Sequence, residues 1–179
     1  LLSNLNYHRL LLGTDEGFTD LTYAQAFIAA GGDPVWMEKK GYGTLEAHVR
    51  SWLDAPDAPP VCLVRYEDLV RDAAGELRRI LAFLGLPLDE PRVAAAARAS
   101  TFERMRELEA AEKSRGQKSE VFPGVSPRAG WNRMFVSEAR VGSTLEPIGP
   151  GLDAAFERRF APLLKRLGYE SAPARPSLP

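Results

Sequence analysis

Few residues in this sequence are of the types that carry acid–base or nucleophilic chemistry. The 179 residues include two histidines, His8 and His48, and one cysteine, Cys62, which are too few for a zinc site with the usual ligand spacings. The sequence has no Gly-x-x-x-x-Gly-Lys phosphate loop and no convincing Ser-His-Asp order. We interpret both histidines as structural, with partly buried and hydrogen-bonded rings. The residues taken by themselves therefore contain no complete catalytic set.

Two adjacent acids, Glu67 and Asp68, follow a short apolar run and resemble a possible carboxylate pair. Acidic residues also stabilise the first turn of a helix, because they complement the positive end of the helix dipole. We therefore interpret this pair as the start of a helix. Cys62 lies inside the apolar run, where we expect a small buried hydrophobic residue.

Composition and charge are those of an ordinary globular protein. Apolar residues make up 45% and charged residues 26%, and the net charge is −1, so nothing global indicates binding to nucleic acid or to a membrane surface. With its single cysteine the chain cannot form an internal disulfide, and we expect a reducing, cytoplasmic location. We expect one domain over residues 1–170 and a disordered, proline-rich tail over 171–179. Because the first residue is not Met, we also expect a fragment, a processed chain or a partial gene model.

The elements that must position any site are mostly helical. Apolar spacing predicts a helix over 18–30 that stops at Gly31, and Thr44 is expected to cap a helix over 45–53. Residues 61–64 form a short apolar run without polar alternation, which is typical of a strand buried on both faces of a parallel sheet. A helix with Leu77, Ile80, Leu81 and Leu84 on one side should follow and end at Gly85.

The second half continues in the same way. Asp89 and Pro91 predict the start of an alanine-rich helix over 92–99, and Ser100 with Glu103 predicts a capping box for the next helix. Between residues 109 and 129 the pattern becomes charged and rich in Gly and Pro, which indicates a long loop. A final helix is expected from a cap at Asp153 to Gly168, with Pro162 as a kink or the true start.

Five segments, in this order along the chain, resemble motifs of the sulfotransferases that use 3′-phosphoadenosine 5′-phosphosulfate (PAPS). Each motif is weak alone, but the set keeps the family's order and spacing. The segments are Tyr-Gly-Thr-Leu-Glu-Ala-His-Val-Arg-Ser-Trp at 42–52, Pro-Val-Cys-Leu-Val-Arg-Tyr-Glu-Asp-Leu at 60–69, Leu-Arg-Arg-Ile at 77–80 together with Phe-Leu-Gly at 83–85, Ser-Thr-Phe-Glu-Arg-Met at 100–105 and Leu-Lys-Arg-Leu-Gly-Tyr-Glu at 164–170.

The resemblance implies the C-terminal part of a P-loop-like α/β fold, mostly helical with one or two parallel core strands. It also implies transfer of a sulfuryl group from PAPS, the co-substrate, to a hydroxyl or amine of a small-molecule acceptor. Positioning and charge stabilisation would supply most of the catalysis, as in phosphoryl transfer. The family's phosphosulfate-binding lysine loop and catalytic histidine would precede Leu1, so we assign no catalytic residue here and expect the chain to be inactive alone.

The resemblance also implies contacts with the nucleotide. Tyr66, Ser100, Phe102 and Met105 match positions around the adenine, where rings stack, a hydroxyl bonds the base edge and a thioether fills a gap. Each of the four also has an ordinary structural explanation, as an N-cap for Ser100 and as core packing for the others. Ser3 matches a serine that hydrogen-bonds the 3′-phosphate.

Arg128 and Gly130 are further candidates, with two competing alignments. Residues 128–130 match the family's Arg-Lys-Gly, which binds the 3′-phosphate, or else Gly130 and Trp131 match a later Gly-Asp-Trp. We favour Arg128 as a phosphate ligand. The stretch 98–140 carries a net positive charge, which supports a nearby anion.

Two other functions compete with the enzyme. The chain can be a non-catalytic helical module for interaction or nucleotide binding that keeps the sulfotransferase scaffold, with exposed apolar faces that pair with another protein. A nucleotide-kinase relative shares the fold but does not account for the Tyr-Glu-Asp-Leu and Ser-Thr-Phe segments. The acceptor and the oligomeric state stay open at this point.

Overall fold

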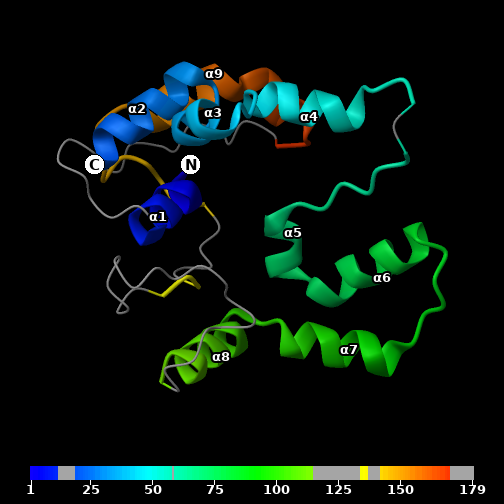
Figure 1. Ribbon diagram of the computed structural model, residues 1–179. Helices are drawn as coiled ribbons and strands as arrows, with labels where there is room; N and C mark the ends of the chain where they lie inside the picture. Colours follow the sequence, from blue (N-terminus) through cyan, green and yellow to red (C-terminus); the bar gives the residue numbers. More distant parts are fainter. Residues whose placement is uncertain (12–18, 58, 115–133, 137–141, 170–179) are drawn as a thin grey trace, which may run out of the picture. The chain divides into compact units, whose positions relative to one another are not determined.

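A computed structural model of the chain describes residues 1–11, 19–57, 59–114, 134–136 and 142–169 (Figure 1). Over these ranges the chain forms nine helices, α1 to α9. It divides into two compact units. The first unit comprises Leu1–Asn6, Thr14–Ala58 and Thr144–Pro179, and the second comprises Tyr7–Gly13 and Pro59–Ser143. Helix α1 (Leu2–Leu11), which the sequence patterns did not indicate, contributes residues to both units.

The first unit contains helices α2 (Asp20–Ala30), α3 (Pro34–Lys40), α4 (Leu45–Leu53) and α9 (Leu152–Arg166). Figure 1 shows α2 beside α9, and the two helices pack against each other. Thr19 caps α2, and Gly31 ends it with a φ of 76°, a left-handed conformation that glycine adopts without strain. Thr44 caps α4 by accepting a hydrogen bond from the amide of Ala47. The predicted helices over 18–30 and 45–53 are thus confirmed where the structure describes them.

The core of the first unit is built from residues far apart in the sequence. Phe27 is 1% exposed, and the centre of its ring lies 6.0 Å from that of Tyr23 and 6.2 Å from that of Phe160. Leu5 and Leu163 complete the buried cluster. Apolar burial of this kind is the main favourable term in folding, so this cluster holds α2 and α9 together.

The start of α9 differs from the prediction. The N-cap is Gly151, and Asp153 lies in the first turn. The Asp153 carboxylate instead accepts hydrogen bonds from the Thr144 hydroxyl and, at 2.7 Å, from the Leu145 amide. Asp153 therefore ties the preceding turn to the helix. Pro162 lies inside α9, and the helix continues through it from Leu152 to Arg166 without a break. Pro162 is therefore not the start of the helix.

The second unit contains α5 (Tyr66–Arg71), α6 (Ala73–Phe83), α7 (Glu90–Ala99) and α8 (Phe102–Ser114). Helix α6 ends at Phe83 with Leu84 as its C-cap, and Gly85 follows with a φ of 65°, which confirms the predicted stop. Asp89 caps α7, which confirms the predicted start of that helix. Helix α8 continues to Ser114, and the first residues of the predicted 109–129 loop are therefore helical. Residues 115–129 lie outside the described ranges.

Residues 61–64 are not a strand, which corrects the prediction of a buried core strand. Val61 and Leu63 are 40% and 42% exposed, and no strand is assigned anywhere in the described residues. A strand is defined by its pairing, and a single apolar run without a neighbouring strand does not form one. The run is instead held by Arg79, whose guanidinium donates to the Leu63 carbonyl at 2.6 Å and to the Cys62 sulfur at 3.3 Å.

Each helix in the described ranges falls short of the combined length and apolarity that a membrane span needs. The same residues contain no cluster of three or more His, Cys, Asp or Glu side chains arranged to hold a metal ion.

Candidate functional site

Tyr66 is the first residue of α5 and its side chain is 51% exposed. The helix start is fixed by Asp68, whose carboxylate accepts from Arg65 at 2.6 Å and from Arg71 at 3.0 Å. Hydrogen bonding to Arg65 lowers the pKa of Asp68. Glu67 and Asp68 both lie in the first turn, so their interpretation as helix-start residues is confirmed. The ion pairs of Asp68 with Arg65 and Arg71 do not cover the Tyr66 ring, which stays accessible.

Ser100 lies at the junction of α7 and α8, but it does not cap α8. Its backbone closes α7, and its hydroxyl donates to the carbonyls of Ala96 at 3.0 Å and Ala97 at 3.3 Å. Thr101 takes the capping role, since its hydroxyl oxygen accepts from the Arg104 amide at 3.3 Å. The predicted N-cap is therefore wrong by one residue, because the Ser100 hydroxyl bonds back to the preceding helix.

Phe102 and Met105 lie on one face of α8, and both side chains are half-buried. They are three positions apart, which places them on neighbouring turns of the same helix face. The Arg106 guanidinium lies 5.8 Å from the centre of the Phe102 ring, a cation–π distance. The spacing on one helix face is confirmed, but neither residue belongs to a buried core cluster of the described residues.

Glu109 lies on the same face and was not indicated as a functional residue by the sequence. Its side chain is buried, with 1% exposed. The carboxylate accepts from the backbone amides of Phe135 at 2.6 Å and Val136 at 2.8 Å, and from Lys113 at 2.9 Å. Burial raises the pKa of Glu109, but the two amides and Lys113 outweigh it and the net pKa is lowered. The available signal was the Glu-Lys pair at i, i+4.

The other predicted residues lie on other elements of the chain or outside the described residues. Ser3 is an exposed residue of α1 in the first unit. Tyr66 shares the second unit with α8, but within the described part of that unit no hydrogen bond or ring contact links it to Ser100, Phe102 or Met105. Arg128 and Gly130 lie outside the described residues.

The remaining chemically distinctive residues have structural surroundings. His8 is fully buried and makes an edge-on ring contact with Tyr7 at 6.2 Å. His48 is exposed on α4, so the expectation of a partly buried ring is wrong for this residue. Cys62 is half-buried beside Arg79. The described residues thus offer aromatic, thioether and hydroxyl groups suited to contact a flat ring, rather than a nucleophile and base in contact.

Comparison with known proteins supports the family resemblance. The sequence pattern of the sulfotransferase domain matches residues 18–165. Sulfotransferase 1C2 of Rattus norvegicus is 30% identical over 89 residues, which cover 50% of this chain and 30% of the relative. Sulfotransferase 6B1 of Danio rerio is 32% identical over 99 residues, covering 55% of this chain and 32% of the relative.

A third relative is named for its acceptor. The 3-alpha-hydroxysteroid sulfotransferase of Cavia porcellus is 34% identical over 68 residues, which cover 38% of this chain and 24% of the relative. The matched segments thus span about a quarter to a third of each relative's length. Since the domain pattern covers most of the chain, this protein belongs to the sulfotransferase domain family.

Proposed function

We propose that the chain supplies the adenine side of the donor site in a PAPS-dependent sulfotransferase. The observation that carries the proposal is the domain match over residues 18–165, which includes Tyr66, Ser100, Phe102 and Met105. When bound, PAPS supplies the activated sulfuryl group. The acceptor is a small molecule with a hydroxyl or amine, in line with the hydroxysteroid named for one relative.

The side chains present suit a purine. Tyr66 offers a ring that is 51% exposed, and a base can stack on it. Phe102 and Met105 offer an aromatic ring and a polarisable thioether on one face of α8. The Ser100 hydroxyl already donates to α7, but its oxygen keeps lone pairs that can accept a hydrogen bond from the base edge.

For the 3′-phosphate we propose Ser3, Arg128 and Gly130. Ser3 is exposed, so its hydroxyl is accessible to an anion. An arginine suits the phosphate because its guanidinium forms paired, charge-assisted hydrogen bonds.

The 179 residues contain no Gly-x-x-x-x-Gly-Lys loop. Transfer needs a positive group on the sulfuryl oxygens and a base for the acceptor proton, and we assign neither to a residue here. We therefore propose that this chain binds nucleotide but does not transfer the sulfuryl group by itself.

Calorimetric titration with 3′-phosphoadenosine 5′-phosphate (PAP) tests the proposal, with AMP as the matched ligand that lacks the 3′-phosphate. A circular-dichroism melt first establishes that the chain is folded. We expect tighter binding of PAP than of AMP, and weaker binding by Phe102→Ala. Phe83→Ala removes an exposed ring from α6 and serves as the control that leaves affinity unchanged. Equal affinity for both nucleotides, or no binding by the folded chain, contradicts the proposal.

A further inference from the structure

A buried carboxylate joins α8 to a segment that follows much later in the chain. Glu109 accepts hydrogen bonds from two consecutive backbone amides, those of Phe135 and Val136, which lie 26 and 27 positions further on. Charge-assisted hydrogen bonds of this kind are roughly twice as strong as neutral ones. The contact therefore sets the position of the backbone at Phe135 with respect to α8.

Lys113 completes this anchor. Its ammonium lies 2.9 Å from a Glu109 carboxylate oxygen and donates to the Met134 sulfur at 3.7 Å. A buried carboxylate is costly unless it is paired and hydrogen-bonded. Lys113 lies on α8 itself, so it pairs with Glu109 wherever the 134–136 segment lies. The two backbone hydrogen bonds depend on that segment, so its movement would break both of them.

The anchor occupies the helix face that carries the proposed adenine contacts. Phe102, Met105 and Glu109 stand at positions i, i+3 and i+7 of α8, which is one stripe along a helix. The burial pattern agrees, because all three are half-buried or buried while Glu103, on another face, is exposed. The 134–136 segment is therefore bound to the same face as Phe102 and Met105.

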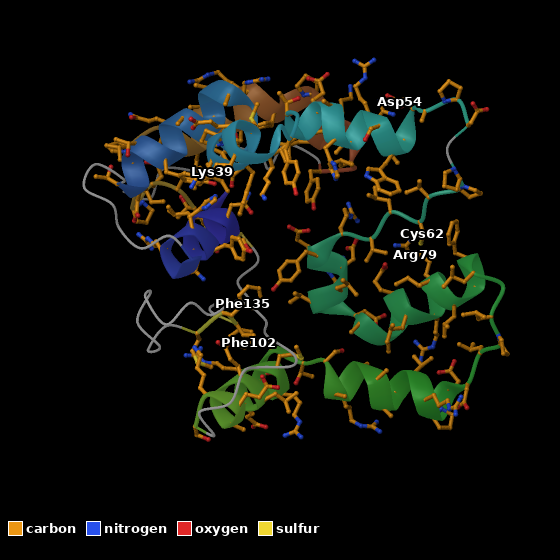
Figure 2. All side chains as sticks on the ribbon, in the orientation of Figure 1. Lys39, Asp54, Cys62, Arg79, Phe102 and Phe135 are labelled. Carbon is orange, nitrogen blue, oxygen red and sulfur yellow. The ribbon has the colours of Figure 1, made fainter. Side chains whose placement is uncertain are left out.

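Phe135 is fixed at its backbone while much of its ring stays exposed. The ring makes an edge-on contact with Tyr7, at 6.4 Å between ring centres, and the residue is 47% exposed. Figure 2 shows Phe102 at the start of α8 and Phe135 on the segment beside that helix. An accessible aromatic ring with a fixed backbone suits stacking on a base, because little conformational freedom is lost on binding.

We propose that Phe135 is a further contact residue for the nucleotide base and that Glu109 is the positioning residue that holds it. Glu109 itself does not touch the ligand. The inference rests on the proposed function, since the ligand is the same adenine nucleotide. It adds a residue and a positioning device that the motif resemblance did not indicate.

The test compares PAP affinity and unfolding free energy in a double-mutant cycle of Glu109→Gln and Phe135→Ala in the 179-residue chain. Stacking of a base on an aromatic ring predicts roughly tenfold weaker binding by Phe135→Ala. Glu109→Gln should weaken binding similarly in the wild-type background and scarcely at all when Phe135 is already Ala, because both act through the same ring. Glu103→Gln, an exposed acid on the same helix, is the matched control.

Hydrogen exchange gives a direct readout of the anchor. The amides of Phe135 and Val136 should be protected in the wild-type chain and exchange faster in Glu109→Gln. If Glu109→Gln does not fold, Phe135→Leu, at an exposed side chain, still tests the base contact. Unchanged PAP affinity in the Phe135 variants of a chain that binds PAP overturns this inference alone. Additive losses in the double variant overturn the positioning role, and a folded wild-type chain that binds no PAP overturns both proposals.

Discussion

The Tyr23 hydroxyl donates a hydrogen bond to the Asp33 carboxylate at 2.7 Å inside the first unit. Asp33 is also the N-cap of α3, where it accepts from the amides of Val35 and Trp36. Burial and the bond to Asp33 both raise the pKa of Tyr23, so the hydroxyl keeps its proton. One carboxylate thus joins the start of α3 to the buried face of α2.

Replacing Tyr23 with Phe removes a donor to this carboxylate. Because hydrogen bonds to charged groups contribute most when buried, we expect a loss of ~1.5–3 kcal/mol in the free energy of unfolding. Urea denaturation measures it. Tyr42→Phe, at a ring that is 62% exposed, is the control and should change stability by less than about 0.5 kcal/mol. Equal effects of the two variants would show that the Tyr23–Asp33 bond is dispensable.

Phe27 should be the most sensitive aromatic residue of the first unit. It is 1% exposed and packs against both Tyr23 and Phe160, so Phe27→Ala leaves a cavity and should cost ~3–5 kcal/mol. Phe83→Ala removes an equal ring that is 44% exposed, and its cost should be much smaller. Thermal unfolding of both variants and of the wild type measures the difference. Equal decreases in the thermal midpoint of the two variants would contradict the prediction.

Two adjacent hydroxyl residues at the start of α8, Ser100 and Thr101, should differ in their effects on stability and on nucleotide binding. Thr101→Ala removes the oxygen that accepts from the Arg104 amide and should lower stability by ~0.5–2 kcal/mol. Ser100→Ala should affect stability less but weaken nucleotide binding, since we propose that its hydroxyl contacts the base. Urea denaturation and PAP titration of both variants provide the comparison. The reverse pattern would return the capping role to Ser100.

Acid should weaken the anchor at Glu109. The pKa of Glu109 is lowered in the folded chain, so near pH 4 the unfolded chain binds more protons than the folded one. The stability from this group is therefore present above about pH 4.3, the ordinary glutamate pKa, and is lost as the pH falls through the folded-state pKa. Glu109→Gln removes the titrating group, so its stability deficit should shrink with acidification. Urea denaturation from pH 7 down to pH 3 measures this difference, and a deficit that stays constant refutes it.

Arg166 and Asp54 pair across 112 positions of the first unit, with paired hydrogen bonds that join α9 to the end of α4. The hydrogen bond to Arg166 lowers the pKa of Asp54. Both side chains are partly exposed, so we expect a coupling energy of only ~0.2–1 kcal/mol that falls in high salt. A double-mutant cycle with Asp54→Asn and Arg166→Gln measures it. The exposed pair Arg104 and Glu107, within α8, is the control, and a salt-independent coupling would contradict the prediction.

Much of the helical structure follows from the sequence alone. Thr44 and Asp89 sit at predicted N-caps, and Gly31 and Gly85 follow the predicted helix ends. These signals are local, because a cap or a left-handed glycine acts within about one turn. The family was also predictable, because the order of its motifs can be read from the sequence. The domain match over residues 18–165 confirms the family.

Other features depend on which distant residues meet. The cap at the α7–α8 junction moved from Ser100 to Thr101, since the Ser100 hydroxyl bonds carbonyls of the preceding helix. Residues 61–64 have the composition of a buried strand, but pairing defines a strand, and composition does not supply a partner.

The contacts of Glu109 show most clearly what local sequence patterns do not predict. In the sequence Glu109 is one acid among several charged residues of α8. Its burial follows from the approach of Phe135 and Val136, more than two dozen positions away. The sequence alone thus determined most of the helices, through interactions that span a few residues, and the family, through the order of its motifs. Only the tertiary structure decided which charge is buried and what it holds, because that outcome depends on contacts closed over long stretches of chain.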